Sequence, residues 1–144
     1  ELLESLLQIR MMLEPPFARL AARNRTSEQI LELHGILEKE AAANGRNPQA
    51  LTDLDFEFHL LIALASGNRV YPLLLNSFRS VYTNLSGQFF RNTKVTDAVH
   101  GYHEKMVNAV ESGNETRAAS VMKAILNHGE KHLREMIGQE SLSL

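Results

Sequence analysis

Apolar residues recur at helical spacing along almost the whole chain, and this periodicity limits the folds that the chain can adopt. Side chains three or four residues apart lie on one face of an α-helix, so an apolar stripe at that spacing predicts a helix packed on a core. The segments with this pattern are residues 1–24, 26–45, 48–65, 70–90, 96–110 and 115–136. No segment has a convincing strand pattern. The sequence therefore predicts an all-α fold, an antiparallel bundle of six to seven helices.

Local signals mark several of the helix ends. Thr26 with Gln29 three residues later forms a capping box, which predicts a helix start. Asn47 before Pro48 is typical of another start, because asparagine caps the first turn and proline fits the first helical position. The Ser-Gly-Asn sequence at residues 66–68 predicts the turn that ends this helix.

Two segments carry more specific expectations about helix continuity and core positions. In the first segment, Pro15-Pro16 predicts a bend or a break near Glu14, because proline removes a backbone hydrogen-bond donor. In the fourth segment, Leu73 and Leu74 are among the predicted core positions.

Composition indicates one globular domain. The chain has 144 residues, of which 44% are hydrophobic and 22% charged, as in an ordinary folded domain. We expect residues 1–138 to form the bundle and residues 139–144 to be a frayed tail. Because the chain begins at Glu1 within a helical pattern, we expect a fragment that lacks an N-terminal part.

Charge and cysteine content exclude several functions. The net charge of −2 argues against a nucleic-acid surface on these residues, since such surfaces are usually basic. There is no cysteine, so disulfides, thiolate metal sites and a cysteine nucleophile are ruled out. No phosphate-binding glycine loop or nucleophile elbow is present, and no apolar run is long enough to span a membrane. We expect a cytoplasmic protein without membrane contact.

Asp55 and His59 are the polar residues that most need an explanation. They are four residues apart in the third segment and adjoin Phe58 and Ile62 on its apolar side. A carboxylate and an imidazole at the edge of a core are unfavourable unless a metal, a ligand or each other satisfies them. A local Asp55–His59 hydrogen bond is the simplest interpretation. Spacing alone does not choose between His100 and His103 as a third member.

Several short motifs stand in an order and spacing that resemble one known family. They are Arg10 with Glu14, Asp55-x-x-Phe58-His59, Ala65-Ser66-Gly67-Asn68, and His103 followed by Ala109-Val110-x-x-Gly113-Asn114. Together they resemble the FCD domain, the C-terminal effector-binding domain of the FadR branch of GntR transcription regulators. The resemblance covers about residues 5–136.

This resemblance implies an all-α bundle that binds a small carboxylate, an organic or sugar acid, and often a divalent metal such as Zn²⁺, Ni²⁺ or Mn²⁺. In the intact regulators such a domain follows a winged helix-turn-helix domain that binds operator DNA as a dimer. The DNA-binding domain would be missing here.

The resemblance also implies metal ligands. Three of the family's four ligands map onto Asp55, His59 and His103, but the fourth position holds Ile125. His128, one helical turn further on, could substitute, or water or the effector's carboxylate could fill the position. Alternatively, the metal is lost and the three residues bind the effector directly.

Arg10 matches an arginine of the family pattern and is a candidate for binding the effector's carboxylate as a bidentate pair. The alternative for Arg10 is an ordinary surface ion pair with Glu14. Arg79, Tyr82 and Arg91 are weaker candidates for the effector cavity, without a motif to support them.

Two other functions compete with a sensor domain. A metal-dependent hydrolase would need a general base, but Glu57 falls on the opposite helix face and Glu104 lies about 100° around the helix from His103. A purely structural helical dimerisation module would need neither a ligand nor a metal. We therefore expect a non-enzymatic regulator domain that forms a homodimer.

Overall fold

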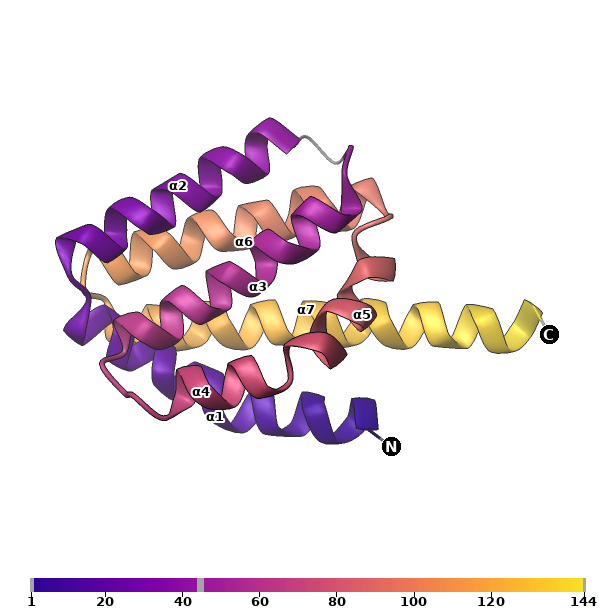
Figure 1. Ribbon diagram of the computed structural model, residues 1–144, viewed down its shortest axis with the longest axis horizontal. Helices are drawn as coiled ribbons and strands as arrows, with labels where there is room; N and C mark the ends of the chain where they lie inside the picture. The colour runs from indigo at the N-terminus through magenta and orange to yellow at the C-terminus, as the bar shows by residue number, and fades with distance from the viewer. Residues whose placement is uncertain (1, 44–45, 144) are drawn as a thin grey trace.

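The chain folds into a helical bundle in the computed structural model, which describes residues 2–43 and 46–143 (Figure 1). The helices in these ranges are α1 Leu2–Asn24, α2 Ser27–Ala43, α3 Pro48–Ala65, α4 Tyr71–Ser77, α5 Arg79–Phe89, α6 Thr93–Glu111 and α7 Glu115–Ser143. No strand occurs among the described residues. The predicted all-α fold is confirmed.

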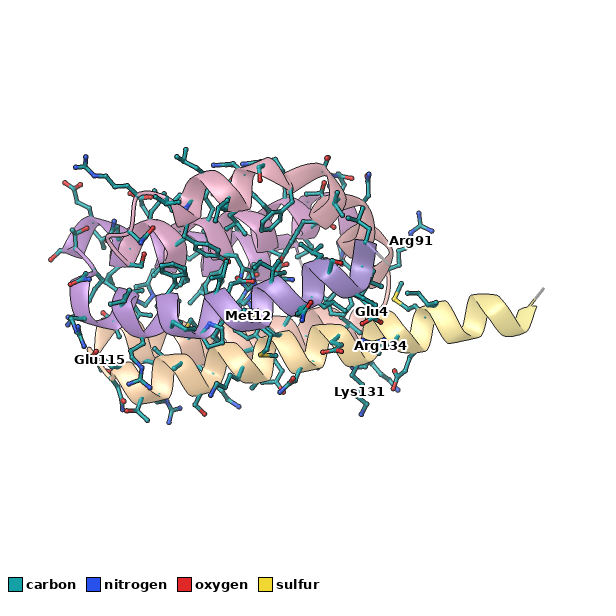
Figure 2. All side chains as sticks on the ribbon, turned by 90° about the horizontal axis from the view of Figure 1, so that it is seen from below. Glu4, Met12, Arg91, Glu115, Lys131 and Arg134 are labelled. Atoms are coloured by element: carbon teal, nitrogen blue, oxygen red, sulfur yellow. The ribbon has the colours of Figure 1, made fainter. Side chains whose placement is uncertain are left out.

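Helix α3 lies at the centre of the arrangement, and α1, α2, α4 and α5 all pack against it. Because other helices cover most of α3, its buried positions include polar side chains such as Thr52, Asp55 and His59. On the side seen in Figure 2, α1 and α7 run alongside each other, and α7 projects beyond the rest of the bundle. Glu4 and Arg134 join these two helices near that end with an N–O distance of 2.5 Å.

Among the described residues, three groups of buried side chains fill the bundle. The largest lies between α1, α2, α3, α6 and α7 and includes Phe58, Ile62 and Met106. A second group forms around Phe89 and a third around Phe56. The candidate site is therefore surrounded by packed apolar side chains rather than by solvent.

The predicted caps are confirmed. Gln29 N–H donates to Thr26 Oγ1 over 3.2 Å, and Thr26 N–H donates to the Gln29 side chain over 2.9 Å. Asn47 accepts a hydrogen bond from Ala50 N–H over 3.1 Å at the start of α3. The end of α2, predicted near Gly45, lies outside the described residues.

Other helix boundaries differ from the prediction. No break occurs near Glu14, because α1 continues as one helix through Pro15 and Pro16. Packing of the following residues on the core, with Ala18 fully buried, outweighs the lost backbone hydrogen bonds. Whether α1 bends there stays a prediction. Helix α6 begins at Thr93 rather than near residue 96, because the Asn92 side chain caps it.

The fourth predicted helix is divided. Phe78, with φ −112° and ψ 20°, separates α4 from α5. As a result Leu73 and Leu74 are exposed, at 68% and 45%, and the prediction that they belong to the core is wrong. Tyr71 and Leu75 point into the bundle instead.

The last helix is longer than expected. It continues past Met136 to Ser143, so residues 139–143 extend α7 and Leu144 lies outside the described residues. None of the described helices combines the length and the apolar character needed to cross a bilayer.

Candidate functional site

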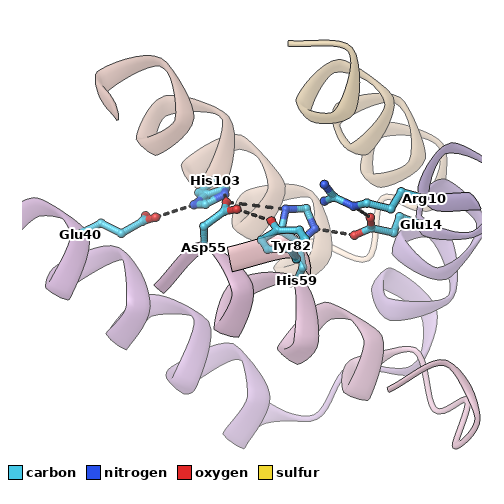
Figure 3. A network of polar contacts seen from close by, with 7 residues as sticks. All are labelled: Arg10, Glu14, Glu40, Asp55, His59, Tyr82 and His103. Carbon is cyan, nitrogen blue, oxygen red and sulfur yellow. Dashed lines mark hydrogen bonds and ion pairs between the residues drawn. The ribbon is translucent and has the colours of Figure 1, made fainter. Parts of the chain in front are cut away.

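Asp55 and His59 of α3 meet His103 of α6 inside the bundle (Figure 3). One potential ligand atom from each lies within 4.8 Å of the other two. Asp55 Oδ1 is 3.2 Å from His103 Nε2 and 3.8 Å from His59 Nε2. The three residues are 8%, 2% and 0% exposed, respectively, so water does not solvate them freely. The structure thus brings together the three residues that the family resemblance singled out, and it selects His103 over His100.

A buried glutamate contacts the Nδ1 atom of each imidazole. Glu14 Oε1 contacts His59 Nδ1 and Glu40 Oε2 contacts His103 Nδ1, each over 2.6 Å. A carboxylate at Nδ1 fixes the proton there, which leaves Nε2 of both rings directed toward Asp55. This carboxylate–histidine arrangement is typical of metal-binding histidines.

The contacts of Asp55 show which polar atoms of the cluster have a hydrogen-bond partner. Its Oδ2 accepts a hydrogen bond from the Tyr82 hydroxyl of α5. At 3.8 Å, the predicted local hydrogen bond between Asp55 and His59 is not formed. His103 Nε2 is buried and makes no hydrogen bond to any residue that the structure describes, despite its nearness to Asp55. Such a buried ring nitrogen is unfavourable unless a further ligand completes it.

Arg10 joins the cluster through Glu14. Its Nε donates to Glu14 Oε2 over 2.5 Å, and its guanidinium carbon lies 4.5 Å from the centre of the Tyr82 ring. The Arg10 and Glu14 side chains are only 12% and 2% exposed. The alternative of a surface ion pair is therefore wrong, and the pair is an internal one.

The charges of the site depend on one another. Burial alone would raise the pKa of Glu14, but Arg10 and His59 lower this pKa to about 2. Burial likewise opposes ionisation of Asp55, but the contact with His103 and the charge of His59 bring its pKa well below the usual range. Burial lowers the pKa of His103, but contacts with Asp55 and Glu40 raise it to about 9. Glu14 and Asp55 thus stay ionised, and a proton on His103 or a cation can balance their charges.

A cavity of about 40 Å³ lies beside this cluster, and its lining includes Arg10, Asp55, His59 and Tyr82. Ile125 and His128 of α7 also line it. His128 is not among the residues whose ligand atoms gather around Asp55, so the structure does not bring it to the fourth ligand position. Burial and the neighbouring His132 lower the pKa of His128 below its ordinary value.

The remaining candidates lie elsewhere. The guanidinium of Arg79 stacks on Phe56 at 4.2 Å and lies 3.5 Å from Glu57, with its side chain 47% exposed and outside the cavity lining. Arg91 is exposed and directed away from the bundle (Figure 2). His100 contacts Glu40 over 3.2 Å without reaching Asp55.

Sequence reasoning missed Glu40 and the buried role of Glu14. A signal for Glu40 exists, because it follows Leu33 and Ile36 at helical spacing on the apolar face of α2. A carboxylate at a core position of this kind needs a buried partner, and the histidines of α6 supply it.

Comparisons with known proteins found a matching family model and similar relatives. The family model described as the FCD domain matches residues 5–128. A fatty acid metabolism regulator protein of Salmonella paratyphi C is 27% identical over 116 residues, covering 78% of this chain and 45% of the relative. A protein of the same name from Klebsiella pneumoniae is 27% identical over 113 residues with the same coverage. A solved structure, Streptococcus agalactiae GntR, superposes with a TM-score of 0.69 and 25% identity over 86% of this chain and 56% of that one. The chain therefore spans about half the length of the relatives that it matches.

Proposed function

The chain belongs to the FCD domain family, and from that premise we propose that it is the effector-binding domain of a GntR/FadR-type transcription regulator that senses a small carboxylate. The single observation that carries this proposal is a buried cation, Arg10, on the same cavity as Asp55 and His59. Only the Nε of Arg10 donates to Glu14, and its terminal nitrogens have no hydrogen bond to described residues. A guanidinium with such donors suits a carboxylate.

We propose that Asp55, His59 and His103 hold a divalent metal, Zn²⁺, Ni²⁺ or Mn²⁺. Two observations support the fit: His103 Nε2 is buried without a hydrogen-bond partner among the described residues, and carboxylates hold Nδ1 of both histidines. One oxygen and two nitrogen donors suit these ions. Because Ile125 offers no ligand, water or the effector's carboxylate would complete the coordination. When bound, the metal would act as a Lewis acid toward the carboxylate.

The relatives are regulators and not enzymes, so the hydrolase alternative is not supported. Neither candidate base reaches the cluster, because Glu57 is 51% exposed beside Arg79 and Glu104 is 57% exposed beside His100. We further propose that the protein is cytoplasmic, forms a homodimer, and contacts DNA through a winged helix-turn-helix domain outside these residues.

The test is the double substitution Asp55→Ala with His59→Ala. We expect it to abolish the rise in melting temperature that Zn²⁺ or small carboxylates give by mass action, while the helical circular dichroism signal remains. A matched control replaces an exposed aspartate and a half-exposed histidine, Asp53→Ala with His34→Ala, and should keep the response. Unchanged binding in the first double variant would refute the site. A protein that responds to neither metal nor acid would be a structural dimerisation module.

A further inference from the structure

The walls of the cavity differ sharply from its polar end. Arg10, Asp55, His59 and Tyr82 form that end. The other walls are largely hydrocarbon, from α1, α5, α6 and α7: Leu7, Phe89, Val99, Ile125, Leu126 and Leu133. Ile125 is 9% exposed and stands where the family resemblance implies a histidine, so this chain has an apolar wall at that position.

Little hydrogen-bonding capacity remains for the body of a ligand. The Tyr82 hydroxyl is already used by Asp55, and His59 Nδ1 and Arg10 Nε are used by Glu14. The hydrogen-bonding groups that remain free at this end are enough for one carboxylate.

The side of the cavity formed by α6 and α7 offers few further polar partners among the described side chains. Glu130 is held by Arg134 over 2.8 Å. Tyr102 and His128 also line the cavity, with their ring centres 5.3 Å apart. Apart from Tyr102, His128 and the engaged Glu130, the described lining on this side is apolar, so a hydroxyl placed against Val99, Ile125 or Leu126 finds no side-chain partner there.

The volume of the cavity limits the size of the ligand, independently of the polarity of its walls. A cavity of about 40 Å³ accommodates about three water-sized groups, since each needs roughly 10–15 Å³ by this measure. Propionate and butyrate also have more non-hydrogen atoms than this, but they exceed the space far less than a sugar acid or a long acyl chain does.

We propose that the effector is a short monocarboxylate with an unsubstituted hydrocarbon body, of the propionate or butyrate class, and that Ile125 selects against hydroxylated acids. The carboxylate lies at Arg10 and the Asp55 cluster, and the hydrocarbon lies against Ile125, Val99 and Phe89. This inference rests on the proposed function and specifies its ligand. A hydroxyl placed against these walls loses its hydrogen bonds to water without replacement.

The experiment compares acids that differ by one hydroxyl. Isothermal titration calorimetry of the chain with butyrate and with 3-hydroxybutyrate, each with and without Zn²⁺, measures the ratio of the two dissociation constants. We expect butyrate to bind about tenfold more tightly. The 3-hydroxy acid is preferred to a 2-hydroxy acid because a 2-hydroxyl could chelate the metal directly. Gluconate and octanoate extend the series to a sugar acid and a longer chain, and both should bind more weakly than butyrate.

The variant Ile125→Thr places a hydroxyl on the wall and should reduce the preference for butyrate several-fold. The control Ile137→Thr makes the same change on an exposed part of α7 and should leave the ratio as it is. Tighter binding of 3-hydroxybutyrate, gluconate or octanoate would overturn the inference but leave the sensor function standing. Absence of binding by every acid to the folded chain would overturn both.

Discussion

Glu14 provides the most direct test of the buried network, because one carboxylate accepts from both Arg10 and His59. The substitution Glu14→Ala leaves the guanidinium, only 12% exposed, without its counterion and removes the acceptor of the imidazole Nδ1–H. The pKa of Glu14 is about 2 against an ordinary value of 4.5. At ~1.4 kcal/mol per pKa unit, the site favours the ionised carboxylate by about 3 kcal/mol.

Removing one partner of a buried ion pair typically costs about 3–5 kcal/mol, because the other charge remains buried. We therefore expect Glu14→Ala to lower the free energy of unfolding by about 3–5 kcal/mol. For a chain of this length, each kcal/mol lowers the melting temperature by roughly 2–4 °C. Urea unfolding at pH 7, followed by far-ultraviolet circular dichroism, gives the change from the midpoint and slope.

The matched control is Glu4→Ala, the same substitution on the same helix. Glu4 also pairs with an arginine, Arg134, but the two side chains are 59% and 48% exposed, so we expect a loss of at most about 1 kcal/mol. The double variant Glu14→Ala with Arg10→Leu should recover part of the lost stability, because it removes the unpaired charge. Equal small effects of Glu14→Ala and Glu4→Ala would refute the reasoning that burial makes the first pair important.

Three further predictions test other parts of the structure. Glu40→Gln should weaken Zn²⁺ binding at least about tenfold in calorimetry with unchanged helicity, because Glu40 orients His103. Burial lowers the pKa of His128 below the 6.5 of the unfolded chain. The stability that neutral His128 contributes to the fold is therefore complete above pH 6.5 and is lost as the pH falls below that value. His128→Gln should therefore lose less stability between pH 7.5 and 5.5 in urea unfolding. Gly67→Ala, at φ 79°, should destabilise by about 1–2 kcal/mol in thermal unfolding, whereas Gly35→Ala, in a helix with open space at Cβ, should stabilise by about 0.5–1 kcal/mol.

The starts of α2 and α3 were predictable because a cap depends on residues close in sequence. The reciprocal bonds of Thr26 and Gln29 span three residues and need nothing from the rest of the fold. The division at Phe78 depends on distant packing instead. Tyr71 of α4 stacks on Phe17 of α1 with ring centres 4.3 Å apart, and periodicity within residues 70–90 contains no information about that contact.

The candidate site was likewise predictable where it depends on local sequence, but not where it depends on the packing of distant helices. Burial of Asp55 and His59 followed from their spacing on an apolar helix face, which is a local property. Their partners did not follow, because Glu14 is 45 residues from His59 and Glu40 is 63 residues from His103. A single sequence shows that a buried carboxylate needs a partner, but only the packing of helices decides which one it finds.

The network has a mechanical consequence for the proposed sensor. Figure 3 shows polar contacts running from Glu40 of α2 through the central cluster to Arg10 of α1, so one set of side chains ties together α1, α2, α3, α5 and α6. Glu14 holds Arg10 and His59 at once, and a ligand carboxylate on the terminal nitrogens of Arg10 would share the guanidinium with Glu14. Any weakening of the Glu14 contacts loosens the polar link between α1 and α3, and a buried ionised group cannot stay unpaired. In the proposed sensor, effector binding at Arg10 would therefore be coupled to the position of α1 against α3 through the Arg10–Glu14–His59 contacts.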